Sequence, residues 1–357
     1  MALDQVLLLG SVILLAAVLA ARLGSRLGLP SLLLFLALGM ALGQTILPFN
    51  DADMAHTLGY AALVLILAEG GYTTRWEDIR GALPQAVLLA TLGVGVSVVL
   101  VSLFAHFVLG LPLPVAVLLG AILSPTDSAA VFSVLRRVPL PARIRAVVEG
   151  ESGFNDAPIV LLVTVATQWS LGHGPAGGVP GLVLIIMLQL VAGVAVGVAI
   201  GWIGVFVMRR IALPASGLYP LAGLAWAVLA YGVGASLHVS GFAAVYVAAM
   251  FLGNGKLPHR NATRSFAEGI GWVAQIGLFV MLGMQQSPAD LTACVAVWPQ
   301  RRCVRHLCRA AAVRVRLLRV VPGALARAAV RVLGRAARGG ADHHGHRAAG
   351  RHRAAIQ

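Results

Sequence analysis

Ten apolar stretches follow one another along residues 5–285 of this 357-residue chain. A bilayer hydrocarbon core about 30 Å thick is crossed by roughly 20 predominantly apolar residues in a helix. The pattern therefore predicts an all-α polytopic membrane protein with about ten transmembrane helices. The expected spans cover residues 5–21, 31–48, 57–72, 84–109, 113–135, 147–168, 179–208, 216–235, 239–253 and 266–285.

The charges of the connecting segments support this count. Lys and Arg follow only the first, third, fifth, seventh and ninth spans, whereas the alternate loops carry Asp51, Asp53 and Asp290. Because cytoplasmic loops are enriched in Lys and Arg, we expect the basic loops in the cytoplasm and the N-terminus outside the cell membrane. The basic residues are Arg22, Arg26, Arg75, Arg80, Arg136, Arg137, Arg143, Arg145, Arg209, Arg210, Lys256, Arg260 and Arg264.

Composition agrees with a membrane protein. The chain is 59% hydrophobic and 11% charged, where a soluble protein usually has about 25% charged residues. The net charge of +14 resembles that of a nucleic-acid-binding protein, but 14 of the 27 Lys and Arg residues lie after Gln300. The rest of the chain is nearly neutral. We therefore expect membrane lipid, and no nucleic acid, as a partner.

Residues 299–357 differ from the rest of the chain, being rich in Arg, Ala and His without a membrane-length apolar run. They could be a disordered tail or a polyanion-binding arm. A third hypothesis is translation out of frame. When residues 334–349 are back-translated and read in the neighbouring frame, they can give an apolar amino-acid sequence that contains Gly-Leu-Arg-Gly. We favour the shifted frame, with an incomplete transmembrane domain at 1–298.

Residues 149–156 place three carboxylates and an amide at the head of an apolar run. An ionisable residue inside a span costs about 2.5–3.5 kcal/mol on insertion scales, so its default interpretation is functional. On a helix beginning near Ala146, Glu149, Ser152 and Asp156 share one face, while Glu151 and Asn155 share an adjacent one.

Asp156 lies about ten residues into that expected helix and hence near mid-membrane. Burial favours its protonated form and a nearby cation favours the ionised form, so it can hold a proton or a cation. The Asp156 carboxylate and the Ser152 hydroxyl would supply two oxygen ligands. The alternative is a hydrogen-bond network between packed helices, and for Asn155 ligand support and packing are equally plausible.

The fifth span contains a helix breaker. Pro125 has no N–H group and disfavours a helical Ser124. Backbone carbonyls released at membrane depth must line a cavity or face protein, and such breaks form ion sites in many transporters. We expect the Thr126 carbonyl or hydroxyl as a ligand. Asp127 is a second ligand or, in the interpretation we favour, neutralises helix N-termini.

Glu69 closes the third span on the basic side. It is either a carboxylate at the cytoplasmic mouth or a solvated helix end. The sequence has no phosphate-binding glycine loop, nucleophile triad or zinc motif. We expect no enzymatic activity and no cofactor.

Two segments resemble the monovalent cation:proton antiporters of the NhaP type, within the larger fold family that includes NhaA. They are residues 124–131, Ser-Pro-Thr-Asp-Ser-Ala-Ala-Val, and residues 149–156, with the Leu-Pro-Ala-Arg-Ile-Arg of 140–145 between them. The resemblance covers about residues 5–298. It implies a homodimer with a dimerisation part and a core of crossed, broken helices.

The resemblance also implies roles for individual residues. Asp156 would bind the transported proton and cation, Na⁺ or K⁺, with Ser152 and the Thr126 backbone as ligands and Glu69 acting through water. Asn155, in place of a second Asp, would suggest one-for-one exchange. In the family Glu151 pairs with an Arg of a late Gly-Leu-Arg-Gly motif, which the in-frame tail lacks.

A typical member has about three further spans after the tenth. We therefore expect this polypeptide to transport poorly, although its site residues are those of an antiporter. The competing hypotheses are an inactive truncated product and a membrane protein whose basic tail binds anionic lipid or nucleic acid. A channel is disfavoured because no pore-loop filter repeats in the sequence.

Overall fold

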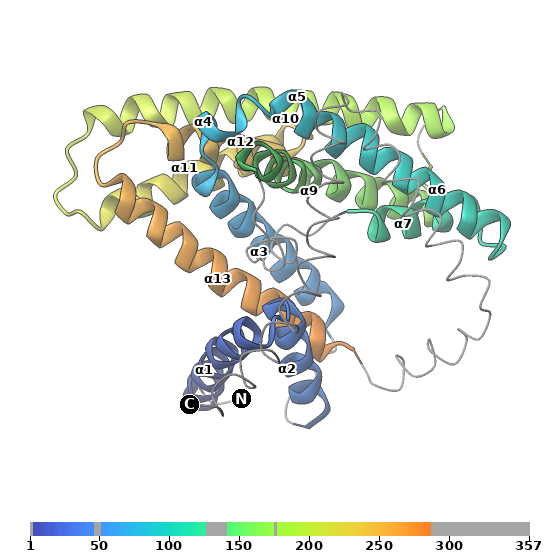
Figure 1. Cartoon of the computed structure of the whole chain (residues 1–357), viewed down its shortest axis with the longest axis horizontal. Helices are drawn as coiled ribbons and strands as arrows, with labels where there is room; N and C mark the ends of the chain where they lie inside the picture. The colour runs from blue at the N-terminus through green and yellow to red at the C-terminus, as the bar shows by residue number, and fades with distance from the viewer. Residues whose placement is uncertain (1–2, 46–50, 126–140, 175–176, 287–357) are drawn as a thin grey trace, which may run out of the picture.

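The fold was analysed in a computed structural model, which describes residues 3–45, 51–125, 141–174 and 177–286. These residues form helices and connecting turns, without a β-strand among them. Figure 1 shows their arrangement. The helices are α1 (Leu3–Leu27), α2 (Ser31–Thr45), α3 (Ala52–Thr73), α4 (Trp76–Ile79), α5 (Leu83–Leu88), the π-helical turn η1 (Leu89–Gly93), α6 (Val94–Phe107), α7 (Leu113–Leu123), α9 (Ala142–Ser170), α10 (Gly178–Arg210), α11 (Leu218–Ser236), α12 (Gly241–Asn254) and α13 (Arg260–Met284).

Each of the ten predicted spans corresponds to a helix. The fourth is built from α5, η1 and α6, and only the first half of the fifth lies in the described part, as α7. By length and composition alone, six helical segments can cross a membrane, and three shorter apolar helices accompany them in the described residues. The short α4, whose first turn carries Glu77 and Asp78, was not predicted.

The centre of the fold is α12. All residues from Gly241 to Met250 are buried, because α3, α10 and α11 pack around this helix. Small residues allow the close approach: a Cβ atom added to Gly197 of α10 would lie 2.6 Å from the Ala244 carbonyl oxygen. Small residues at helix contacts are typical of membrane proteins, where close backbone packing drives association.

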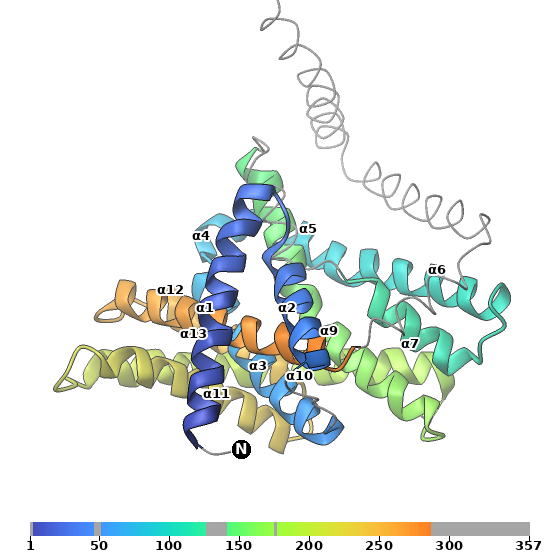
Figure 2. The same ribbon diagram turned by 90° about the horizontal axis from the view of Figure 1, so that it is seen from below.

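Two further groups of helices flank this centre. On one side α13 packs against α2 and α3, and α1 packs against α2. On the other, α7 packs between α6 and α9. Helix α9, seen nearly end-on in Figure 1 and lengthwise in Figure 2, connects the groups because it contacts α3, α10 and α12 as well as α5 and α7. The carboxylate-bearing helix therefore lies between the two halves of the described fold.

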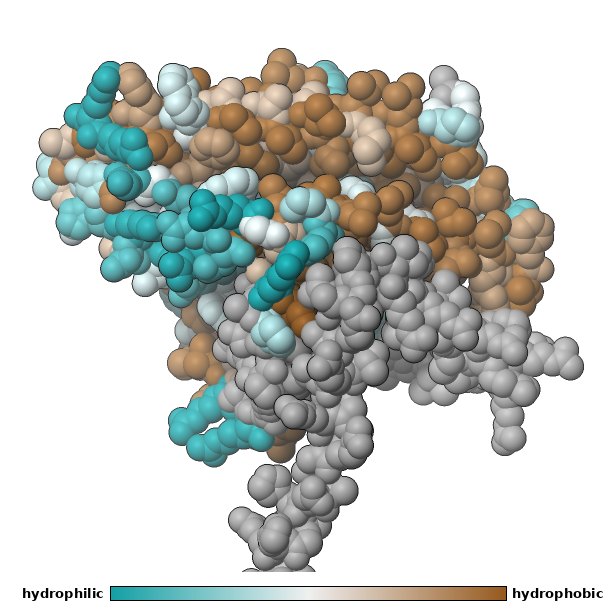
Figure 3. All heavy atoms as spheres, turned by 45° about the horizontal axis from the view of Figure 1, so that its top comes forward, coloured by the Kyte–Doolittle hydropathy of each residue, from teal (hydrophilic) through white to brown (hydrophobic). Residues whose placement is uncertain are grey.

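Several of the basic loops meet at one end of the molecule. The Asn254 side chain at the end of α12 accepts a hydrogen bond from the Trp76 backbone of α4 at 2.9 Å, and Arg260 Nε donates to the Gly253 carbonyl at 2.8 Å. The α10–α11 and α12–α13 loops lie beside each other at the left of Figures 1 and 2. Figure 3 shows hydrophilic side chains gathered at this end and a broad hydrophobic surface beyond them.

Candidate functional site

Helix α9 carries the acidic segment and begins earlier than predicted. It starts at Ala142, directly after the N-cap residue Pro141, and not near Ala146. Proline is compatible with a helix start because the first N–H groups have no partner within the helix. Arg143, predicted in the preceding loop, therefore belongs to the first turn. Asp156 is the fifteenth of the 29 residues of α9, at the middle of the helix.

The side chains of the acidic segment that the structure describes differ in burial. Glu151 and Asn155 are both buried, with 9% and 0% of their surface exposed, and Asp156 on the adjacent face is half-buried. Ser152 is helical, but its side chain and that of Glu149 lie outside the described part. Helix α9 continues through Pro158, which has no N–H to donate to the carbonyl of Phe154.

The predicted helix break before Pro125 is confirmed on its N-terminal side. Helix α7 ends at Leu123 with Ser124 as its C-cap residue. The buried Ser124 hydroxyl donates to the Gly120 carbonyl at 2.5 Å, which supplies a partner for a carbonyl in the last turn. Thr126 and Asp127 lie outside the described residues, and the roles expected for them remain predictions.

Tyr246 of α12 is a site residue that the sequence analysis missed. It is buried, its ring meets that of Phe154 edge-on at 5.7 Å between centroids, and its hydroxyl lies 3.2 Å from the Thr74 hydroxyl. It interacts electrostatically with both Asp156 and Glu69. Gly153 leaves room for it, since a Cβ atom there would lie 2.7 Å from the tyrosine oxygen. The available signal was a single hydroxyl-bearing residue in the otherwise apolar stretch 241–250.

Glu69 is a half-buried side chain of α3 and not a solvated helix end. It lies against Gly271 of α13, where a Cβ atom would be 2.6 Å from the Glu69 Cγ atom. Arg264 and Glu268, also on α13, interact with it electrostatically. The Arg264 guanidinium donates a hydrogen bond to the Thr73 carbonyl at the end of α3. Neither Arg264 nor Glu268 was predicted as a neighbour of Glu69.

One buried tyrosine packs against both helices that carry the candidate carboxylates. Tyr246 lies beside Gly153, three residues before Asp156 on α9, and beside Gly70, next to Glu69 on α3. The same helices are joined elsewhere by the Tyr60 and Thr164 hydroxyls, which lie 3.3 Å apart. In the low dielectric of a protein interior a carboxylate is stable either protonated or beside a cation. The arrangement can therefore hold a proton or a cation with oxygen ligands.

Comparison with known proteins agrees with this chemistry. The chain is 38% identical over 248 residues to the K(+)/H(+) antiporter NhaP of Alkalimonas amylolytica and 34% identical over 244 residues to the K(+)/H(+) antiporter NhaP2 of Shewanella sp. strain MR-4. The alignments cover 69% and 68% of this chain, and 42% of each relative. It is also 30% identical over 226 residues to the Na(+)/H(+) antiporter ApNhaP of Aphanothece halophytica, covering 62% of this chain and 43% of the relative.

The fold is that of a solved antiporter. Two structures of the sodium proton antiporter MjNhaP1 from Methanocaldococcus jannaschii superpose with TM-scores of 0.66 and 0.70, each at 23% sequence identity. They cover 80% and 82% of this chain, and 71% and 73% of theirs. The predicted polytopic antiporter fold is thus confirmed, although the chain spans less than half the length of the curated relatives named above.

A family model for the transmembrane part of sodium/hydrogen exchangers matches residues 12–331, most of the chain. Its description is that of a transporter family and not of a catalytic enzyme. The chain belongs to the sodium/hydrogen exchanger family.

Proposed function

We propose that this transmembrane domain exchanges a monovalent cation, Na⁺ or K⁺, for a proton, and that the two compete for Asp156. The observation that carries the proposal is the position of this carboxylate. It is half-buried at the middle of a 29-residue helix, in the part of α9 on which the buried Tyr246 packs. An ionisable residue at that depth is costly unless it has a function.

The remaining ligands follow from the motifs and from the family. Ser152 and the Thr126 backbone or hydroxyl would complete the oxygen shell, and Glu69 would contribute through water. Asp127 and Asn155 would support the site, and Glu151 would pair with an arginine from a later span. With a single carboxylate at the centre, exchange would be one cation for one proton.

The proposed location is the cell membrane, with the basic loops in the cytoplasm and the N-terminus outside. Three of those loops meet at one end of the described fold. Loops on the same side of a membrane are expected at the same end of the protein. We further propose that the protein works as a homodimer surrounded by lipid. No cofactor is needed, because the transported ions supply the chemistry.

We also propose that residues 299–357 are an out-of-frame tail, so that this polypeptide transports poorly. Two observations support this proposal: the composition changes after Pro299, and the neighbouring frame can encode Gly-Leu-Arg-Gly. The match to the family runs to residue 331. Sequencing the coding DNA around codon 300 therefore separates a shifted frame from a divergent family C-terminus.

Transport itself is tested in inverted vesicles from cells lacking their own antiporters. The chain as given, a frame-corrected chain and its Asp156→Asn variant are expressed to equal levels. We expect Na⁺ or K⁺ to dissipate the proton gradient only with the frame-corrected chain. Equal dissipation by the Asp156→Asn variant would contradict the role of Asp156, and strong dissipation by the chain as given would contradict the tail proposal.

A further inference from the structure

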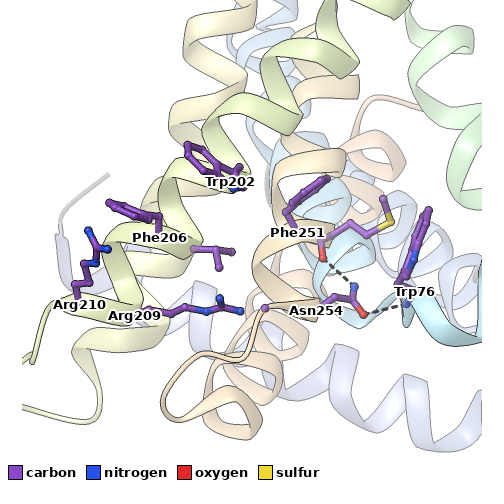
Figure 4. Close-up of a pocket in the computed structure, with 10 residues that line it drawn as sticks. Trp76, Trp202, Phe206, Arg209, Arg210, Phe251 and Asn254 are labelled. Carbon is purple, nitrogen blue, oxygen red and sulfur yellow. Dashed lines mark hydrogen bonds between the residues drawn. The ribbon is translucent and has the colours of Figure 1, made fainter.

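A cavity of about 540 Å³ opens at the basic end of the molecule (Figure 4), and neither Asp156 nor Glu69 lines it. The last turns of α10 form one wall and the end of α12 forms the other, with Trp76 at the start of α4 beside them. Its volume falls within the range of roughly 300–1,000 Å³ that is usual for small-molecule sites. Nothing in the proposed exchange mechanism uses it.

The positive charge at the cavity comes from two consecutive arginines. Arg209 points from α10 across the opening towards α12, and Arg210 turns back over Phe206, with its guanidinium carbon 3.8 Å from the ring centroid. Among the described residues, those that line the cavity include no carboxylate. In the described part of the chain, neither arginine forms a salt bridge, and the ion pair found nearby joins Arg75 to Asp78. The cavity therefore offers uncompensated positive charge.

The amide in the lining, Asn254, already uses both of its N–H groups. Its amide nitrogen donates to the Thr74 and Met250 carbonyls at 2.9 and 2.8 Å, and its oxygen accepts from the Trp76 backbone at 2.9 Å. Asn254 thus fixes α4 against α12 and shapes the cavity. An incoming anion would be bound by the arginines.

The apolar part of the lining is aromatic and faces outwards. Trp202 stacks on Phe206 at 5.9 Å between ring centroids, and their side chains are 61% and 43% exposed. Phe251 lies opposite on α12, also exposed. Trp202 precedes Arg209 by seven residues, which is about 10 Å along a helix. The cavity is therefore cationic at one end and apolar at the other.

Basic residues beside exposed aromatic rings at the end of a membrane span are typical of the interface between headgroups and acyl chains. Basic pockets between spans on the cytoplasmic side bind anionic headgroups. We propose that this cavity binds one anionic phospholipid, with its phosphate at Arg209 and Arg210 and its acyl chains along Trp202, Phe206 and Phe251. A soluble anion would leave the aromatic wall exposed, and a neutral lipid would leave the arginines without a counter-charge.

The test uses the purified full chain in uncharged detergent and phospholipids with brominated acyl chains, which quench nearby tryptophans. Brominated phosphatidylglycerol should quench at a concentration at least about fivefold lower than brominated phosphatidylcholine. Each arginine near an anionic surface is worth roughly a fivefold change in affinity. Arg209→Gln should therefore raise the phosphatidylglycerol midpoint about fivefold and the double Arg209→Gln, Arg210→Gln variant more, without changing that for phosphatidylcholine.

Two variants serve as matched controls. Arg80→Gln removes an exposed arginine of the same end that does not line the cavity, and it should leave the preference unchanged. Trp202→Phe should remove much of the quenching specific to phosphatidylglycerol. If the double variant does not fold, native mass spectrometry of the wild-type chain tests the same lipid preference. The chain should retain one phosphatidylglycerol in preference to phosphatidylcholine.

Three results would overturn the proposal. Equal midpoints for the two lipids in the wild-type chain would show that charge does not select the ligand. Displacement of brominated phosphatidylglycerol by millimolar inorganic phosphate would identify a soluble anion as the occupant. Protection of Trp202 from both lipids alike, in a chain that elutes as a dimer, would show that a second copy covers the cavity.

Discussion

The Tyr246 hydroxyl of α12 lies 3.2 Å from the Thr74 hydroxyl, just after the end of α3. The same tyrosine packs edge-on against Phe154 of α9. One side chain of α12 therefore contacts both α9 and the residue that follows α3. Its hydroxyl and its ring have separable roles, and substitutions can distinguish them.

Replacing Tyr246 by Phe should cost about 0.5–1.5 kcal/mol of stability, the usual contribution of one hydrogen bond. Replacing it by Ala should cost about 3–5 kcal/mol, as loss of a buried aromatic side chain does. Thermal or denaturant unfolding of the purified chain in detergent measures both. Equal losses for the two variants would show that the hydroxyl, and not ring packing, dominates.

The close contact between α10 and α12 predicts a second effect. Gly197→Leu should separate the helices, because even a Cβ atom at that position would lie 2.6 Å from a backbone oxygen. Overpacking typically costs about 1–3 kcal/mol. Gly232→Leu on α11 is the matched control, since a Cβ atom there meets nothing within 4 Å. The two unfolding midpoints should differ clearly, and similar midpoints would mean that α10 and α12 are not packed as described.

Glu69 and Arg264 should be energetically coupled. Arg264 holds α13 to the end of α3 through the Thr73 carbonyl and interacts electrostatically with Glu69. Residues of one charge or hydrogen-bond network usually show coupling energies of about 0.5–3 kcal/mol. Unfolding of Glu69→Gln, Arg264→Gln and the double variant gives this energy. If the stability losses of Glu69→Gln and Arg264→Gln simply add in the double variant, the two side chains do not interact. As a control, the losses of Glu69→Gln and Arg80→Gln should add.

The order of the long helices could be predicted from the sequence, because an apolar run of membrane length is rare outside a membrane span. A span must also satisfy its own backbone hydrogen bonds as a helix. The middle position of Asp156 followed in the same way. The early start of α9 could not, because the Arg-bearing turn after Pro141 has the composition of a loop. Intrinsic helix propensity predicts such a helix start poorly, because tertiary packing often overrides it.

The partners of the site could not be predicted for a different reason. Tyr246 and Arg264 come near the candidate site only because α12 packs on α3 and α9, and α13 packs on α3. Periodicity assigns a residue to a face of its own helix and is silent on which helix covers that face. The cavity at Arg209 depends likewise on the approach of α10, α12 and α4, which are far apart in sequence.

Competition at Asp156 is tested most directly by cation binding to the purified protein in its verified reading frame. Calorimetry with Na⁺ or K⁺ is performed over a series of pH values and in buffers of different ionisation enthalpy. In the acid range, where Asp156 is protonated, cation binding should release one proton and the apparent affinity should fall tenfold for each unit of pH lowered. Asp156→Asn should abolish both effects. An affinity independent of pH, or proton release that survives in Asp156→Asn, would contradict the mechanism.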